Sequence, residues 1–106
     1  MSNFQTRRPL MPVGPLAIIR LLMAIDDFER VRGRSPYTRE VLDLIHEWGY
    51  GEWIIQAAYD LGLIERYDDY CSRDVKRVCR FNKLSDRGRR FLESVSLIMS
   101  LSGVSE

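Results

Sequence analysis

Apolar residues recur at helical spacing in four stretches of the chain. Residues three or four positions apart lie on one face of a helix, so this period predicts amphipathic helices. The third stretch shows it most clearly, with Ile54, Ala58 and Leu61 on its inward face. Glycines at positions 33, 49 and 62 follow the first three stretches, as helix stop signals do. We expect helices at about residues 16–31, 39–47, 52–61 and 86–101.

The second of these helices has a recognisable start and core face. Thr38 is a candidate N-cap, because a threonine hydroxyl can accept a hydrogen bond from a free amide of the first turn. Val41, Leu42, Ile45 and Trp48 follow at helical spacing. We therefore expect all four apolar side chains to point into the core.

The pattern changes to β-rich alternation between the third and fourth helices. Residues 64–84 contain two extended runs around a polar tip at residues 72–76, which predicts an antiparallel hairpin, here called the wing. Three prolines in residues 1–15 favour an extended N-terminal arm. We expect the arm, one mainly α domain with a small β-hairpin (α+β) at residues 16–101, and a tail at residues 102–106.

The two terminal helices carry more apolar surface than one small core can cover. The first helix is apolar almost all round from Leu16 to Ile25. The last helix places Phe91, Leu92, Val95, Ile98 and Met99 on one face, with Leu97 and Leu101 on a second ridge. A surface helix normally has a single apolar stripe, so a second stripe predicts a second partner. We expect a homodimer formed through the first and last helices.

One motif resembles a known family. Gly62-Leu63-Ile64-Glu65-Arg66 is followed by the wing and then by the run from Phe81 to Arg89, FNKLSDRGR. This arrangement is similar to the signature of winged helix-turn-helix transcription regulators of the MarR-like and PadR-like types. The resemblance implies a winged helix-turn-helix fold with extra terminal helices, in which helix 52–61 would be the recognition helix and the terminal helices would form the dimer.

Charge is unevenly distributed along the chain. The net charge is only +1, but residues 1–34 carry +3, residues 35–65 carry −5 and residues 66–83 carry +3. A basic arm and wing favour contact with a phosphate backbone, whereas the acidic helix pair between them does not. No lysine or arginine lies between Leu42 and Ile64, although arginine and lysine make the commonest specific contacts to guanine.

Two functions remain compatible with this pattern. The first is a homodimeric, sequence-specific or architectural regulator that binds double-stranded DNA. Its candidate contacts are Tyr50, Glu52, Trp53, Gln56 and Tyr59 on the third helix; Arg66, Arg73, Lys76, Arg77 and Arg80 on the wing; and Arg7 and Arg8 on the arm. The alternative is a winged-helix protein-interaction module that uses the acidic helix pair and Trp53, since aromatic residues anchor protein interfaces.

The two cysteines leave two states open. If the wing turns symmetrically about Val75, Cys71 and Cys79 face one another and can form a disulfide. In a reducing cytosol they would instead remain a pair of half-buried thiols. Two cysteines alone cannot complete a structural zinc site within one chain, and the lone His46 has no second ligand, so we expect no metal.

Catalytic motifs and membrane signals are lacking in the sequence. It contains no glycine-rich phosphate loop, nucleophile elbow or metal-ligand cluster, and we therefore predict no enzyme activity and no cofactor. The apolar run at residues 16–25 is broken by Arg20 and is shorter than the about 20 residues that a spanning helix needs. We expect a cytoplasmic protein with no membrane partner.

Overall fold

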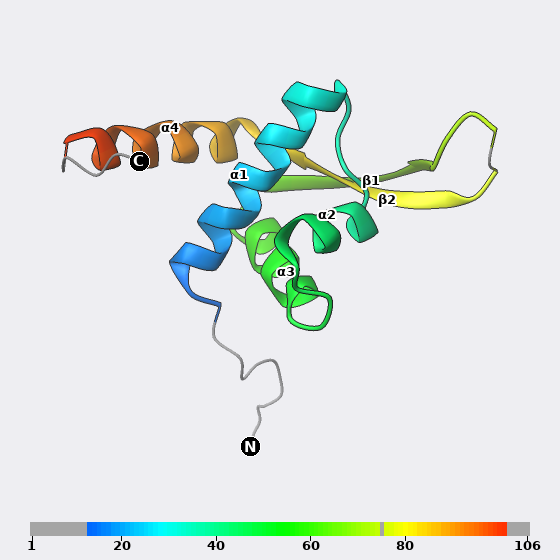
Figure 1. Cartoon of the computed structure of the whole chain (residues 1–106), viewed down its shortest axis with the longest axis horizontal. Coiled ribbons are helices and arrows are strands. Elements are labelled where there is room, and N and C mark those ends of the chain that lie inside the picture. The colour runs from blue at the N-terminus through cyan, green and yellow to red at the C-terminus, as the bar shows by residue number, and fades with distance from the viewer. Residues whose placement is uncertain (1–12, 75, 102–106) are drawn as a thin grey trace, which may run out of the picture.

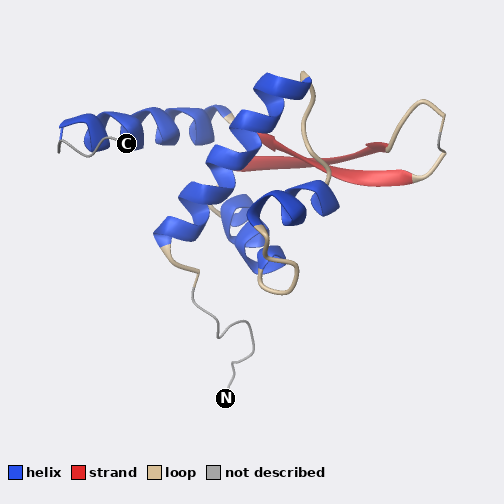
Figure 2. Cartoon of the chain, in the orientation of Figure 1, coloured by secondary structure: helices blue, strands red, loops and turns tan. Residues whose placement is uncertain are grey.

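The computed structural model describes residues 13–74 and 76–101, which form four helices and one two-stranded antiparallel sheet (Figure 1 and Figure 2). The expected α+β class, mainly helical with a small hairpin, is confirmed. Each helix lies within two residues of its expected bounds. The elements are α1 (Pro15–Arg32), α2 (Thr38–Ile45), α3 (Gly51–Asp60), β1 (Ile64–Tyr70), β2 (Val78–Leu84) and α4 (Asp86–Leu101).

Helix α1 is the centre of the fold. It crosses the molecule in Figure 1 and contacts α2, α3, β2 and α4. Its buried side chains are Ile18, Leu21, Leu22, Ile25 and Phe28. Much of the apolar surface that suggested a second partner is therefore covered within the chain. The helix begins at Pro15 and ends before Gly33, whose φ of 72° is left-handed, as the sequence pattern predicts.

Helices α2 and α3 lie next to each other in Figure 1, and two side-chain predictions for this region, for Trp48 and Leu61, are wrong. Helix α2 ends at Ile45, with His46 in the left-handed region, and does not continue to Gly49. Trp48 therefore lies in the turn, 54% exposed, where its indole N–H donates to Asp43 Oδ1 at 2.6 Å. Leu61 follows the last turn of α3 and is 50% exposed, although Ile54 and Ala58 are buried as expected.

The start of α2 also differs from the prediction. Tyr37 occupies the N-cap position, and Thr38 is the first helical residue. The Tyr37 amide donates to Glu40 Oε1 at 3.1 Å, and the Arg34 guanidinium donates to both Glu40 oxygens at 2.9 and 2.8 Å. Burial raises the pKa of the Glu40 carboxyl, but these hydrogen bonds and the Arg34 charge outweigh burial and hold the pKa below its usual value. The Thr38 hydroxyl is thus available for contacts with the hairpin.

The hairpin projects from the helices on one side, and α4 projects on another (Figure 1). Strands β1 and β2 pair from Ile64 with Leu84 to Tyr70 with Val78. Tyr37 adds a bridge to Phe81, and the Asn82 amide donates to the Pro36 carbonyl oxygen at 2.9 Å. The extended segment before α2 therefore pairs with the outer edge of β2.

Two polar residues, Glu29 and Ser85, link the base of the hairpin to the helices through hydrogen bonds. Glu29 of α1 accepts hydrogen bonds from the Ser35 hydroxyl at 3.2 Å, the Leu84 amide at 3.3 Å and the Arg89 guanidinium at 3.0 Å. Ser85 caps α4: its hydroxyl accepts from the Gly88 amide at 2.9 Å and donates to the Gly62 carbonyl oxygen at 2.6 Å. These contacts set the direction in which the hairpin and α4 leave the core.

Candidate functional site

A polar pocket of about 360 Å³ lies where α3 adjoins the hairpin. Its lining residues are Gln56, Tyr59, Arg66, Tyr67, Asp68 and Arg80. The structure therefore brings together four candidate residues that the sequence analysis placed on two separate elements. Tyr67 and Asp68 belong to the same pocket and were not predicted. The pocket joins the outer surface of α3 to the face of the hairpin that carries Arg66 and Arg80.

The outward surface of α3 is acidic and aromatic. Glu52 and Tyr59 are exposed, and Trp53 is 41% exposed. The Gln56 side-chain amide donates to Asp60 Oδ1 at 2.8 Å, so its N–H groups are partly used within the helix. Tyr50 differs from the other candidates of this group, because it precedes α3 and packs half-buried against the hydrophobic core.

Arg66 is anchored inward by a buried polar network. Its Nε donates to Asn82 Oδ1 at 2.8 Å, and its Nη2 donates to Thr38 Oγ1 at 2.9 Å. Asn82 is fully buried, and its side-chain amide donates to Thr38 Oγ1 and to the Pro36 carbonyl oxygen. Burial lowers the pKa of the Arg66 guanidinium, and the nearby Arg80 charge lowers it further. Arg66 is therefore a rigid cation at the wall of the pocket.

Arg80 is paired across the strands with Asp68. Its Nε donates to Asp68 Oδ1 at 2.9 Å and its Nη2 donates to Oδ2 at 3.3 Å. The two residues are direct neighbours in the hairpin register, and their side chains are 56% and 53% exposed. The hydrogen bond from Arg80 lowers the pKa of the Asp68 carboxyl. Water screens this exposed pair, so the pairing can be broken at little cost.

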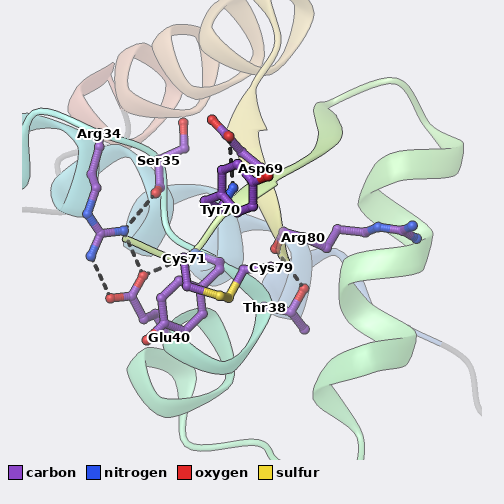
Figure 3. The surroundings of a disulfide bond; sticks show 10 residues. Arg34, Ser35, Thr38, Glu40, Asp69, Tyr70, Cys71, Cys79 and Arg80 are labelled. Carbon is purple, nitrogen blue, oxygen red and sulfur yellow. Dashed lines mark hydrogen bonds and ion pairs between the residues drawn. A yellow bond between two sulfur atoms is a disulfide. The ribbon is translucent and has the colours of Figure 1, made fainter. Parts of the chain in front are cut away.

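The hairpin tip carries cations without such partners. Arg73, Lys76 and Arg77 are exposed, and they form no ion pair with any other residue that the structure describes. They lie between Cys71 and Cys79, which a disulfide joins (Figure 3). The tip is thus a closed loop that presents three positive charges to solvent.

The disulfide does not have the geometry expected from the sequence. The register pairs Cys79 with Asp69, and the Cys71 amide donates to the Arg77 carbonyl oxygen at 2.8 Å. A hairpin symmetric about Val75 would place Cys71 directly opposite Cys79. The prediction is wrong, because the residue opposite Cys79 is Asp69, two positions before Cys71. Such a shift keeps both side chains on the same face of the hairpin, because side chains alternate with a period of two. The two sulfur atoms meet diagonally and not across a directly opposed pair.

The remaining sequence candidates fall outside these sites. Arg7 and Arg8 of the arm, and the tail at residues 102–106, lie outside the described residues.

Within residues 13–74 and 76–101, no cluster of three histidine, cysteine or carboxylate side chains could hold a metal ion. No helix in that part of the chain is long and apolar enough to cross a membrane.

Asn82 and Thr38 are the positioning residues that the sequence analysis missed. Their role depends on contacts between residues more than forty positions apart, as the hydrogen bond from Asn82 to Thr38 shows. The available signal was an asparagine between the apolar residues Phe81 and Leu84 of the second strand. Buried polar side chains need hydrogen-bond partners, so such a residue indicates a polar network without identifying its members.

Comparison of the chain with protein-family models, with curated proteins and with solved structures finds no match.

Proposed function

We propose that the chain is a winged helix-turn-helix regulator that binds double-stranded DNA as a homodimer. The observation that carries this proposal is the hairpin tip, where Arg73, Lys76 and Arg77 are exposed at the end of the projecting hairpin without intramolecular counter-ions among the described residues. In this arrangement α2 and α3 form the helix-turn-helix, and β1 and β2 form the wing. The bridge between Tyr37 and Phe81 supports this arrangement, because it adds the extended segment before α2 to the edge of the wing.

The wing supplies most of the proposed affinity. Its exposed cations contact phosphates or enter a minor groove, which strengthens binding to any sequence. Arg7 and Arg8 of the arm add a minor-groove contact. Helix α3 approaches the major groove, where Gln56 pairs with adenine after it releases Asp60. Because Glu52 and Asp60 repel phosphates, α3 contributes to sequence preference more than to affinity.

Removing the tip charges tests the DNA-binding proposal. The double variant Arg73→Ala with Arg77→Ala should raise the Kd for a mixed-sequence duplex by about tenfold and lower the salt slope by about two, because each phosphate contact adds about 0.9 to that slope. Fluorescence anisotropy at several salt concentrations measures both quantities. Arg87→Ala with Arg90→Ala is the matched control, since it removes two exposed arginines from α4.

Two outcomes would count against parts of this proposal. If the tip and control variants bind equally well, the wing does not contact DNA. If the unaltered protein does not bind duplex at low salt, the DNA-binding function itself is wrong. That second outcome favours the alternative, a protein-interaction module, for which the exposed Trp48 and Trp53 beside acidic residues of α2 and α3 provide the supporting observation.

The dimer is proposed from the apolar surface that the chain leaves uncovered. Leu97, Ile98 and Leu101 of α4 are exposed, as are Leu16 and Met23 of α1. A groove of about 480 Å³ between α1 and α4 adds Val95 and Met99 to this surface. Apolar patches of this kind mark interaction sites on soluble proteins. A two-fold dimer would place two wings on half-sites about 34 Å apart.

A charge placed on α4 tests the dimer. Ile98, which is 64% exposed, should tolerate Ile98→Glu in the folded monomer, but a buried carboxylate in the dimer interface would dissociate the subunits. Light scattering at tens of micromolar should show the mass of a dimer for the unaltered protein and of a monomer for the variant. Val78→Glu introduces the same charge at an exposed apolar position of β2, outside α1 and α4, and should leave the dimer intact. A monomeric unaltered protein would refute the dimer.

A further inference from the structure

We propose that the pocket between α3 and the hairpin seats one phosphodiester group of the DNA backbone. This inference rests on the proposed DNA-binding function and adds a specific anion site to it. The pocket lies between α3 and the hairpin, the two elements that are proposed to approach DNA. A phosphate bound in it would therefore belong to the same DNA-binding surface. Five of its six lining side chains carry hydrogen-bond donors: the Gln56 amide, the hydroxyls of Tyr59 and Tyr67, and the guanidinium groups of Arg66 and Arg80.

The positive charge of Arg66 lacks a bonded counter-ion. Its two hydrogen bonds go to the neutral acceptors Asn82 Oδ1 and Thr38 Oγ1. These bonds fix the plane of the guanidinium, and the described residues supply no acceptor for its third nitrogen, Nη1. A half-buried cation that is held rigidly by neutral groups favours an anion beside it. The carboxylates of Glu52 and Asp68 act on Arg66 only through space.

Arg80 provides the second cation of the site. Side chains alternate along a strand, so Arg66 and Arg80 share one face of the hairpin, where they are diagonal neighbours in the register. Their charges repel each other, and this repulsion adds to the lowering of the Arg66 pKa that burial mainly causes. A phosphodiester offers two unesterified oxygens that can each accept from one guanidinium, which relieves this repulsion. The formal charge of the lining residues is +1, which one phosphodiester would neutralise.

Asp68 occupies the position of this anion in the free protein. Its carboxylate accepts both hydrogen bonds from Arg80 and lines the same pocket. A phosphate that enters must compete with Asp68 for Arg80 and tolerate its negative charge. Asp68 therefore acts as an internal competitor that weakens DNA binding, and its neutralisation should strengthen binding.

The adjacent Asp69 provides a matched control. Asp69 lies on the opposite face of the hairpin, does not line the pocket and accepts a hydrogen bond from the Tyr70 amide. Asp68→Asn and Asp69→Asn change the net charge by the same amount at neighbouring positions. Long-range attraction to DNA should therefore increase equally in both variants. Any difference between them reports the local environment of the pocket.

The experiment measures the Kd of the unaltered protein and five variants for a mixed-sequence duplex at one fixed salt concentration. Asp68→Asn should bind about tenfold more tightly than Asp69→Asn, and Arg80→Ala should bind about tenfold more weakly than the unaltered protein. In the Arg80→Ala background, Asp68→Asn should lose its advantage over Asp69→Asn, because the competition for Arg80 no longer exists. Thermal unfolding by circular dichroism confirms that each variant is folded.

Two results would overturn the phosphate site. Equal affinities of Asp68→Asn and Asp69→Asn would show that only the net charge matters. An advantage of Asp68→Asn that persists without Arg80 would show that the pocket residues do not share one anion. Failure of the proposed function is distinguishable from both, since the unaltered protein would then not bind duplex at low salt.

Discussion

Gly88→Ala should lower the free energy of unfolding by more than about 3 kcal/mol, a large part of the 5–15 kcal/mol typical of a small domain. A Cβ atom at this position would lie 2.1 Å from the Leu63 carbonyl oxygen and 3.1 Å from its carbonyl carbon. These atoms are backbone, so no side-chain rotation can relieve the clash. Leu63 is also held by its hydrogen bond from the Ser85 amide, so α4 would have to leave its position.

The direction of this effect separates tertiary packing from helix propensity. Gly88 lies in the first turn of α4, where alanine would normally favour the helix by up to about 1 kcal/mol. Urea denaturation of Gly88→Ala should instead show a lower free energy of unfolding than that of the unaltered protein. Gly49→Ala is the control, because a Cβ there would meet no atom within 4 Å. If both variants are equally stable, the close approach of α4 to Leu63 is not required by the fold.

Asn82→Leu should destabilise the protein by about 2–3 kcal/mol. The substitution keeps the branching of the side chain and its number of heavy atoms, but it removes the acceptor for Arg66 Nε and the donors to Thr38 Oγ1 and the Pro36 carbonyl oxygen. The Nε–H of a half-buried guanidinium would then lack an acceptor, and this costs more than the hydrogen bond contributed. Urea denaturation measures the loss. The Asn82 backbone amide still donates to Pro36, so pairing at the strand edge is retained.

The double variant Asn82→Leu with Arg66→Met identifies the origin of this cost. If the destabilisation comes from the unpaired Nε–H of Arg66, removing both partners should restore about half of the lost stability. The Arg66→Met single variant completes the double-mutant cycle. If the double variant loses as much free energy of unfolding as the two single variants together, Arg66 and Asn82 are not coupled. Arg66 would then not be a cation held in position by this network.

Local patterns determined most of the secondary structure. Helical periodicity and β-rich alternation depend on neighbours within one or two turns, so they identified four helices and a hairpin without knowledge of the fold. Gly33 and Gly62 ended helices as expected because both adopt positive φ, which glycine tolerates without steric cost. Trp48 was assigned to the core wrongly, since α2 stops one turn before the periodic pattern does.

Candidate cations were found by composition, but their roles were not. Arg66, Arg73, Lys76, Arg77 and Arg80 look equivalent in the sequence. The structure separates them, because cross-strand register pairs Arg80 with Asp68 and long-range folding brings Asn82 and Thr38 to Arg66. Only the tip residues have no such partner in the described part of the chain.

The sequence by itself determined the α+β class, the order of the elements and the uneven distribution of charge, because these depend on local spacing and residue type. Tertiary structure alone decided the hairpin register, the pocket between α3 and the hairpin, and the need for glycine at position 88. Each of these depends on backbone segments far apart in the chain approaching within a few ångströms. Periodicity along the sequence carries no information about such distances. The site could therefore be identified only from the tertiary structure, in which the base of the hairpin lies next to α3.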